Sequence, residues 1–306
     1  MDSINVQASA GHIQAINNPW AKPDQGVEKT TTSTWERGRT RMSRTRMTWD
    51  WNRAGKLTVE IRTRLQCKKG VVRSGTYLVA RSVNEEDRIR LRDISQESEV
   101  IAKYLGRKPI PLDQVNRHFE DKLLPRWERG EPKSAFTLFT VRETRSKSDP
   151  HETKTITAFV GFAVAGPGDN PGESKLAVML RTNAWGKGIS RRMTRVLCQV
   201  YAPAVKAGGA PVFKGKPLER LVATISADDL ESCSLMDQAH FKPAEPKLPV
   251  LDEAAITEVP LEQRYNFIDV VKEKRIKRTA QKQESDGKIV VKYYFAKTVK
   301  TPESIL

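Results

Sequence analysis

The chain of 306 residues has a mass of 34.5 kDa and 38% hydrophobic residues, enough to bury a core, which excludes a wholly disordered protein. Its formal net charge of +16 favours acidic partners such as nucleic acid, an anionic membrane surface or a phosphate-bearing ligand. Three widely spaced cysteines, no apolar stretch of membrane-spanning length and no secretory signal together predict a soluble cytoplasmic protein.

The N-terminal part of the chain divides by composition into two segments. Residues 1–34 are polar and predict a mostly flexible leader. Residues 35–75 predict a basic extension that interleaves arginine with tryptophan, and the alternation at Leu57–Ile61 is typical of a half-buried strand within it. Residues 29–73 carry 13 basic and three acidic side chains, a net charge of +10.

Residues 76–306 alternate strand and helix patterns, which predicts one α/β domain with a mixed, partly antiparallel central sheet flanked by helices. Strands are expected at Thr76–Val83, Ala135–Val141, Ile156–Ala165, Lys175–Leu180, Arg220–Ile225 and Ile289–Val299. Helices are expected after Asn84–Asp87, over Leu112–Leu123 with Pro125 closing it, after Gly188, and over Asp229–Ala239. Residues 244–285 show no sheet pattern and are expected to form an insertion.

The helix after Gly188 is expected to be amphipathic and to keep Arg191, Arg192 and Arg195 off its apolar face. The glycines of the segment Asn183–Gly188 would let backbone N–H groups approach an anion such as a pyrophosphate. The alternative is an ordinary turn between a strand and a helix. No metal is expected, because the histidines and cysteines lack ligand spacing.

Several motifs in order resemble the GNAT N-acetyltransferase superfamily, in particular its ribosomal-protein N-terminal acetyltransferase branch. The similarity covers about residues 76–243. It rests on Trp185-Gly186-Lys187-Gly188-Ile189-Ser190, Asp229-Leu230-Glu231-Ser232, His240-Phe241, Tyr77–Arg81, Glu99–Gly106 and Arg126–Pro132. The sequence departs from the family pattern at Asn183, Lys175, Asp229 and His240, where Gln or Arg, Glu, Asn and Gly are usual.

The resemblance implies acetyl-CoA as co-substrate, without a metal, and direct attack of a primary amine on the thioester. The residues that it assigns to acetyl-CoA binding are Met179, Leu180, Arg181, Asn183, Trp185, Gly186, Lys187, Gly188, Ile189 and Asp229. Ser232 is the candidate proton donor to the leaving thiolate, or else a plain helix-start serine. Glu173 is a candidate general base, or else a solvated turn acid.

The acceptor stays open between a protein N-terminus, a lysine and a small amine. Residues 29–73 suggest contact with nucleic acid or the ribosome, through arginines on phosphates and tryptophans on bases, or else an arm whose tryptophans pack on the domain. Membrane contact is not expected, because the apolar residues form no helical stripe. The alternative to an enzyme is a catalytically degenerate binding protein of the same fold that acts through its basic arm.

Overall fold

The structure of the chain is a computed structural model that forms two compact units, Met1–Ala165 with Ala177–Ala210, and Gly166–Leu176 with Pro211–Leu306. The described residues are 29–35, 45–52, 56–65, 75–104, 110–128, 135–145, 153–168, 170–208, 216–226, 229–243, 266–272, 275–283 and 289–300. Residues 1–28 of the expected leader therefore lie outside the described part, and residues 29–35 form a strand.

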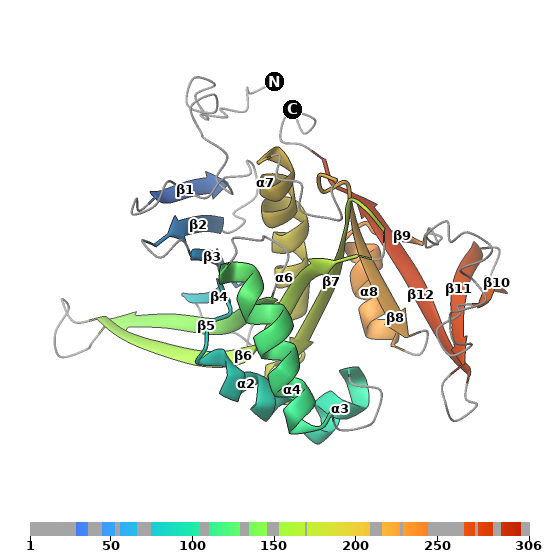
Figure 1. Ribbon diagram of the computed structural model, residues 1–306, viewed down its shortest axis with the longest axis horizontal. Helices are drawn as coiled ribbons and strands as arrows, with labels where there is room; N and C mark the ends of the chain where they lie inside the picture. Colours follow the sequence, from blue (N-terminus) through green and yellow to red (C-terminus); the bar gives the residue numbers. More distant parts are fainter. Residues whose placement is uncertain are drawn as a thin grey trace. The chain divides into compact units, whose positions relative to one another are not determined.

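The first unit contains an antiparallel sheet whose strands follow one another in chain order from β1 to β6 (Figure 1). Its strands are β1 (Lys29–Trp35), β2 (Thr45–Trp51), β3 (Leu57–Arg64), β4 (Thr76–Ser82), β5 (Ala135–Arg145) and β6 (Thr153–Pro167), and β7 (Glu173–Leu180) ends in this unit. The strands expected near residues 57, 76, 135 and 156 are confirmed.

The strands of the basic extension are part of this sheet, since β3 pairs with β2 on one side and with β4 on the other. Burial alternates along both strands of the extension. Trp49 and Trp51 are 4% and 1% exposed, and Leu57, Val59 and Ile61 are at most 1% exposed. Trp49 and Trp51 therefore pack into the core, which agrees with the alternative that the tryptophans of the arm pack on the domain.

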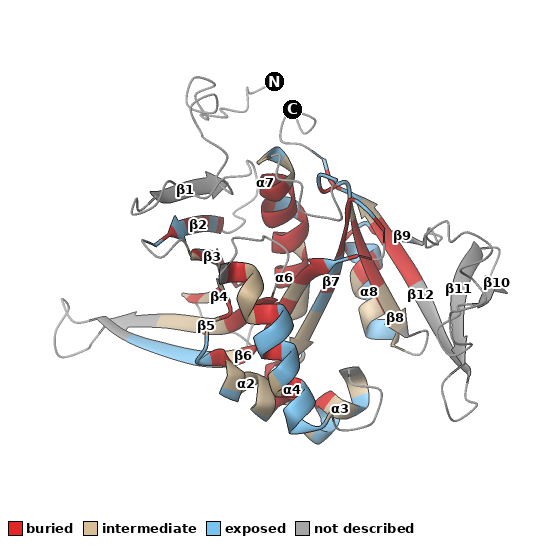
Figure 2. Ribbon diagram, viewed as in Figure 1, coloured by how far each residue is buried: buried red, intermediate tan, exposed pale blue. Residues whose placement is uncertain are grey.

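Helices of the first unit fall into two runs along the chain. The first run contains α2 (Asp87–Ile94), α3 (Ser98–Tyr104), α4 (Leu112–His118), the π-helical turn η1 (Phe119–Leu123) and α5 (Leu124–Glu128). The second contains α6 (Ile189–Val196), the π-helical turn η3 (Leu197–Tyr201) and α7 (Ala202–Ala207). Figure 2 shows α6 and α7 mostly buried, whereas α4 is mostly exposed on the face in view.

Pro125 does not end its helix, contrary to expectation, because the helical run continues through α5 to Glu128. The backbone N–H of Leu124 bonds to the carbonyl of Phe119, five residues back. This wider π-type turn directly before the proline accommodates a residue that has no N–H to donate. Trp127 then lies fully buried and donates from Nε1 to the carbonyl of Ala135 at 2.8 Å.

The second unit is built around β8 (Arg220–Ser226) and β12 (Ile289–Thr298), which are antiparallel, while the start of β7 pairs in parallel with β8. The helix α8 (Leu230–Gln238) follows β8, and the short β9 (Lys242–Pro243) pairs with β12. One parallel pair among antiparallel ones, with flanking helices, confirms the expected mixed α/β sheet.

The expected insertion contains strands, so the expectation of no sheet structure there was wrong. β10 (Asn266–Lys272) and β11 (Arg275–Gln283) are antiparallel, and β11 pairs with β12. The sequence of β11 is RIKRTAQKQ, which lacks a regular apolar alternation. Backbone pairing with an existing strand does not require that alternation, so the sequence pattern missed it.

Candidate active site

The segment between β7 and α6 folds back on the end of its own strand. A single 3-10 turn, η2 (Thr182–Ala184), opens it, and the N–H groups of Ala184 and Trp185 bond to the carbonyls of Arg181 and Thr182 at 2.9 and 3.1 Å. The Trp185 indole donates from Nε1 to the carbonyl of Leu180 at 2.9 Å. These contacts fix the entry of the segment and direct its remaining residues toward the start of α6.

Gly186 and Gly188 both have left-handed backbone conformations, with φ of +69° and +73°. A Cβ atom built on either glycine meets nothing within 4 Å, so the backbone conformation and open space distinguish these positions, not tight packing. Within the described residues, the N–H groups of residues 186–191 have no hydrogen-bond acceptor. N–H groups without an acceptor beside a helix N-terminus, at glycines whose side-chain positions are open, fit a bound phosphate.

The side chains of this segment divide into anchors and open positions. Leu180 and Ile189 are buried, at 2% and 1% exposure, and hold the two ends. Asn183 and Lys187 are exposed, which leaves the Lys187 ammonium available to an anion bound at this segment. Lys103 Nζ lies 5.1 Å from the centre of the Trp185 ring, which adds a second cation near the segment.

Glu97 holds the start of the segment, and sequence reasoning missed it. Its Oε1 accepts from Arg181 Nε, and its Oε2 accepts from the Thr182 N–H and hydroxyl at 3.2 and 3.3 Å. The Glu97 side chain is only 16% exposed. No local motif could reveal it, because its partners lie 84 and 85 residues further along the chain.

The end of β7 approaches β6 unusually closely. A Cβ atom on Gly161 would lie 2.1 Å from the Met179 carbonyl oxygen, and β6 carries an irregularity opposite Leu138 and Phe139. The Arg181 N–H donates to the Val160 carbonyl at 3.0 Å. Of the three amides expected to face a thioester carbonyl, that of Arg181 is therefore already bonded within the protein.

Arg192, on the first turn of α6, is buried, contrary to the expectation that it lies off the apolar face. Its guanidinium donates from Nε to Thr63 Oγ1 at 2.9 Å, and Thr63 Oγ1 is 2.8 Å from Thr45 Oγ1. Burial, and to a lesser extent the charge of Arg195, lowers the pKa of Arg192 to about 10, so it stays protonated at neutral pH. Arg192 therefore lies at a buried position with a hydrogen-bond acceptor on β3, which helical periodicity alone could not indicate.

The N-terminus of α8, in the second unit, is capped by a side chain of its own segment. Asp229 is the N-cap: its Oδ1 accepts from the Ser232 N–H at 3.0 Å and its Oδ2 from the Ser232 hydroxyl at 2.6 Å. This is the geometry of a helix cap, and it accounts for an aspartate at the position where the family usually has asparagine. The roles of Asp229 in cofactor binding and of Ser232 in proton transfer stay predictions.

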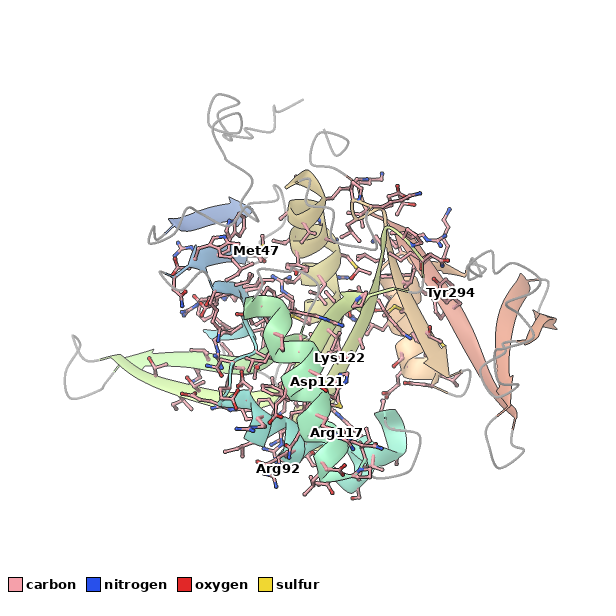
Figure 3. The ribbon with its side chains drawn as sticks, viewed as in Figure 1. Met47, Arg92, Arg117, Asp121, Lys122 and Tyr294 are labelled. Carbon is pink, nitrogen blue, oxygen red and sulfur yellow. The ribbon has the colours of Figure 1, made fainter. Side chains whose placement is uncertain are left out.

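Glu173 begins β7 and is 2% exposed, so it is not a solvated turn acid. Its Oε1 accepts from Arg220 Nη2, and its Oε2 accepts from Asn170 Nδ2 at 3.0 Å and from the Tyr294 hydroxyl at 3.1 Å. Figure 3 labels Tyr294 on β12. A carboxylate with this many donors favours a structural role, and the role of Glu173 as general base stays a prediction.

His240 follows α8 in a left-handed conformation, with φ of +61°. The N–H of Phe241 bonds to the Met236 carbonyl and that of His240 to the Asp237 carbonyl, both at 3.0 Å. This pair of bonds is a Schellman motif, in which glycine is favoured at the position of His240. The family's usual glycine at this position therefore has a backbone reason.

The described residues contain no group of three or more His, Cys, Asp or Glu side chains arranged to hold a metal ion. In the same part of the chain, no helix combines the length and apolar character that crossing a membrane requires.

The solved structures to which the chain is similar include several acetyltransferases. The ribosomal L7/L12 α-N-protein acetyltransferase in complex with coenzyme A is 12% identical over 75% of this chain and 97% of that chain, with a TM-score of 0.43. A GNAT-family acetyltransferase from Bacillus anthracis is 13% identical, over 72% and 94%, with a TM-score of 0.42. A ribosomal-protein-alanine N-acetyltransferase from Brucella melitensis is 17% identical, over 72% and 98%, with a TM-score of 0.37.

These structural similarities are too distant to identify an acceptor, and no curated protein matches the chain. The family model described as acetyltransferase (GNAT) domain matches residues 78–242, more than half of the chain. The match includes the segment Asn183–Gly188, the helix α6 and the start of α8. The chain therefore belongs to the GNAT acetyltransferase family of acyltransferase enzymes.

Proposed function

We propose that the protein is an acetyl-CoA-dependent N-acetyltransferase that moves an acetyl group to a primary amine on a protein or a small molecule. The observation that carries this proposal is the start of α6, where two left-handed glycines have open side-chain positions and the N–H groups have no acceptor among the described residues. Family membership adds the chemistry, since acyl transfer is what the family performs.

The proposal assigns phosphate binding to the N–H groups of residues 186–189, because that of Trp185 is already bonded to the Thr182 carbonyl. The exposed Lys187 ammonium adds a positive charge to them, and the Asn183 amide adds a hydrogen-bond donor. Glu97 keeps these groups in place by holding Arg181 and Thr182 at the start of the segment. Ile189, buried at the first position of α6, fixes the direction of the helix axis.

Acetyl-CoA, when bound, supplies the acetyl group as an activated thioester. The attacking nitrogen forms a bond to the carbonyl carbon, the carbon–sulfur bond breaks, the amine loses a proton and the thiolate gains one. The N–H groups of Met179 and Leu180 are the proposed donors to the carbonyl oxygen, because that of Arg181 is already bonded to Val160. Ser232 is proposed to protonate the thiolate, a role that rests on the family resemblance of its segment.

The function is tested by titrating the full chain with acetyl-CoA in a calorimeter and then measuring thiol release with protein N-terminal peptides, lysine peptides and polyamines. Saturable binding followed by amine-dependent thiol release supports the proposal. Absence of acetyl-CoA binding contradicts it, and binding without release for every amine supports the catalytically degenerate alternative.

The role of Ser232 is tested by comparing Ser232→Ala with Ser234→Ala, an exposed serine on the same helix. General acid catalysis contributes about 10²–10⁴-fold, so thiol release by Ser232→Ala should fall by at least about 10²-fold with unchanged acetyl-CoA affinity. Ser234→Ala should retain the wild-type rate. If the rate of thiol release falls by less than about threefold, Ser232 acts only in capping the helix and not as a proton donor.

A further inference from the structure

The two faces of β2 and β3 have opposite chemistry. Met47, Trp49 and Trp51 face the core, at most 4% exposed, and Figure 3 labels Met47 on β2. Trp49 and Trp51 therefore cannot stack on the bases of a nucleic acid. The outward positions alternate with them and include Arg46 and Arg64, both exposed.

Strand register gathers three arginines at one end of this outward face. Arg46 on β2 pairs directly across from Arg62 on β3, and Arg64 pairs across from Tyr77 on β4. The Arg62 guanidinium carbon lies 4.4 Å from the centre of the Tyr77 ring. We call this group, Arg46, Arg62, Arg64 and Tyr77, the arginine face.

The charges of the arginine face are unfavourably placed between β2 and β3, although Arg62 also contacts the Tyr77 ring. Like charges directly opposite each other on neighbouring strands are destabilising, and Arg46 faces Arg62. In the part of the chain that the structure describes, neither Arg46 nor Arg64 has an ion-pair partner. The outward carboxylates Asp50 and Glu60 lie further along the strands, across from threonines of β3 and β2.

We propose that the arginine face binds the phosphate backbone of a single-stranded nucleic acid. Guanidinium groups bind phosphates bidentately, and a sheet face with an aromatic ring is a common platform for unpaired nucleotides. An anionic membrane fits less well, because the outward positions next to the arginines on β2 and β3 are Thr48 and Glu60, which offer no apolar side chain for insertion.

The sequence segments that precede β2 and follow β3 are also basic. Thr45 and Thr63 pair across from each other, so the chain enters β2 and leaves β3 at the end that carries the arginines. Residues 36–44 contain four arginines and one glutamate, and residues 66–73 contain two lysines and one arginine. These basic segments add to the net positive charge that attracts a polyanion to the chain.

The experiment measures binding of a short fluorescein-labelled polyuridine strand to the full chain by anisotropy over a range of salt concentrations. The test variant combines Arg46→Gln, Arg62→Gln and Arg64→Gln. The matched control combines Arg92→Gln, Arg117→Gln and Lys122→Gln, which removes the same charge from α2, α4 and η1 (Figure 3). Both variants therefore have the same net charge, and only its location differs.

Each phosphate contact on a single strand contributes about 0.7 to the slope of log affinity against log salt. The arginine-face variant should therefore lose about 2 from that slope and bind at least about tenfold more weakly at low salt, while the control keeps the wild-type slope. Its melting temperature should stay close to that of the wild type, because removing the like-charge pair offsets the loss of the Arg62 contact with the Tyr77 ring.

Equal slopes for the two variants would overturn the proposal, and so would wild-type protein that binds no polyuridine. Wild-type binding to phosphatidylserine vesicles that the arginine-face variant alone loses, with polyuridine binding intact in that variant, would assign the face to a membrane and also overturn it. Acetyl-CoA affinity does not enter the test, so its outcome is independent of the proposed enzymatic function.

Discussion

The helices α6 and α8 begin in opposite ways. At the start of α6, the backbone N–H groups are unbonded among the described residues, and the side-chain positions of Gly186 and Gly188 are open. At the start of α8, the Asp229 carboxylate caps the helix and accepts from both the N–H and the hydroxyl of Ser232. A helix N-terminus attracts negative charge in both cases, but only the first leaves that charge to be supplied by a ligand.

The glycine start of α6 gives the largest expected effect. Gly188→Ala should weaken acetyl-CoA binding by about tenfold or more, because a side chain at φ of +73° forces the N–H groups out of their positions. Gly75→Ala is the matched control, since Gly75 has φ of +79° and the same open surroundings. Calorimetric affinities that fall equally in both variants would show general strain and not a phosphate site.

The helix α6 is also attached to the sheet by a buried side chain. Arg192 anchors α6 to Thr63, so Thr63→Val should leave a buried guanidinium short of an acceptor and lower the free energy of unfolding by about 1–3 kcal/mol. Thr58→Val, on the exposed face of the same strand, should change it by less than about 0.5 kcal/mol. Urea unfolding of both variants measures the difference, and equal stabilities would remove Arg192 as an anchor.

The closed start of α8 predicts a smaller effect. Asp229→Ala removes the N-cap and should lower the free energy of unfolding by about 1 kcal/mol. Asp229→Asn keeps a capping oxygen and should stay within a few tenths of a kcal/mol of the wild type, since asparagine and aspartate cap about equally well. An alanine variant as stable as the asparagine variant would contradict the cap.

The far end of α8 predicts the smallest change, and it is stabilising. His240→Gly should raise the free energy of unfolding by about 0.5–1 kcal/mol, because glycine adopts φ of +61° without the steric cost of a Cβ atom. Gln238→Gly, inside the last turn, should instead lower it. Thermal unfolding in which both glycines destabilise would exclude the Schellman geometry at His240.

The sequence predicted the elements whose residues carry a local signal. The alternation at Leu57–Ile61 and the glycines before α6 are examples, because each reflects a period or a backbone requirement within a few residues. The contacts of Glu97 and Arg192 could not be predicted, since each joins residues more than 80 positions apart. Strand β11 was missed because its pairing with β12 depends on backbone bonds and not on an apolar pattern.

The central claim is that the start of α6 binds the phosphates of acetyl-CoA. It is tested most directly by titrating protein labelled with ¹⁵N at its 18 glycines and following their amide resonances, assigned through the Gly186→Ala, Gly188→Ala and Gly75→Ala variants. The Gly186 and Gly188 resonances should shift downfield in proportion to occupancy, as N–H groups do when they bond to a phosphate, while the Gly75 resonance stays fixed. Saturation with acetyl-CoA that leaves the Gly186 and Gly188 resonances in place would contradict the claim.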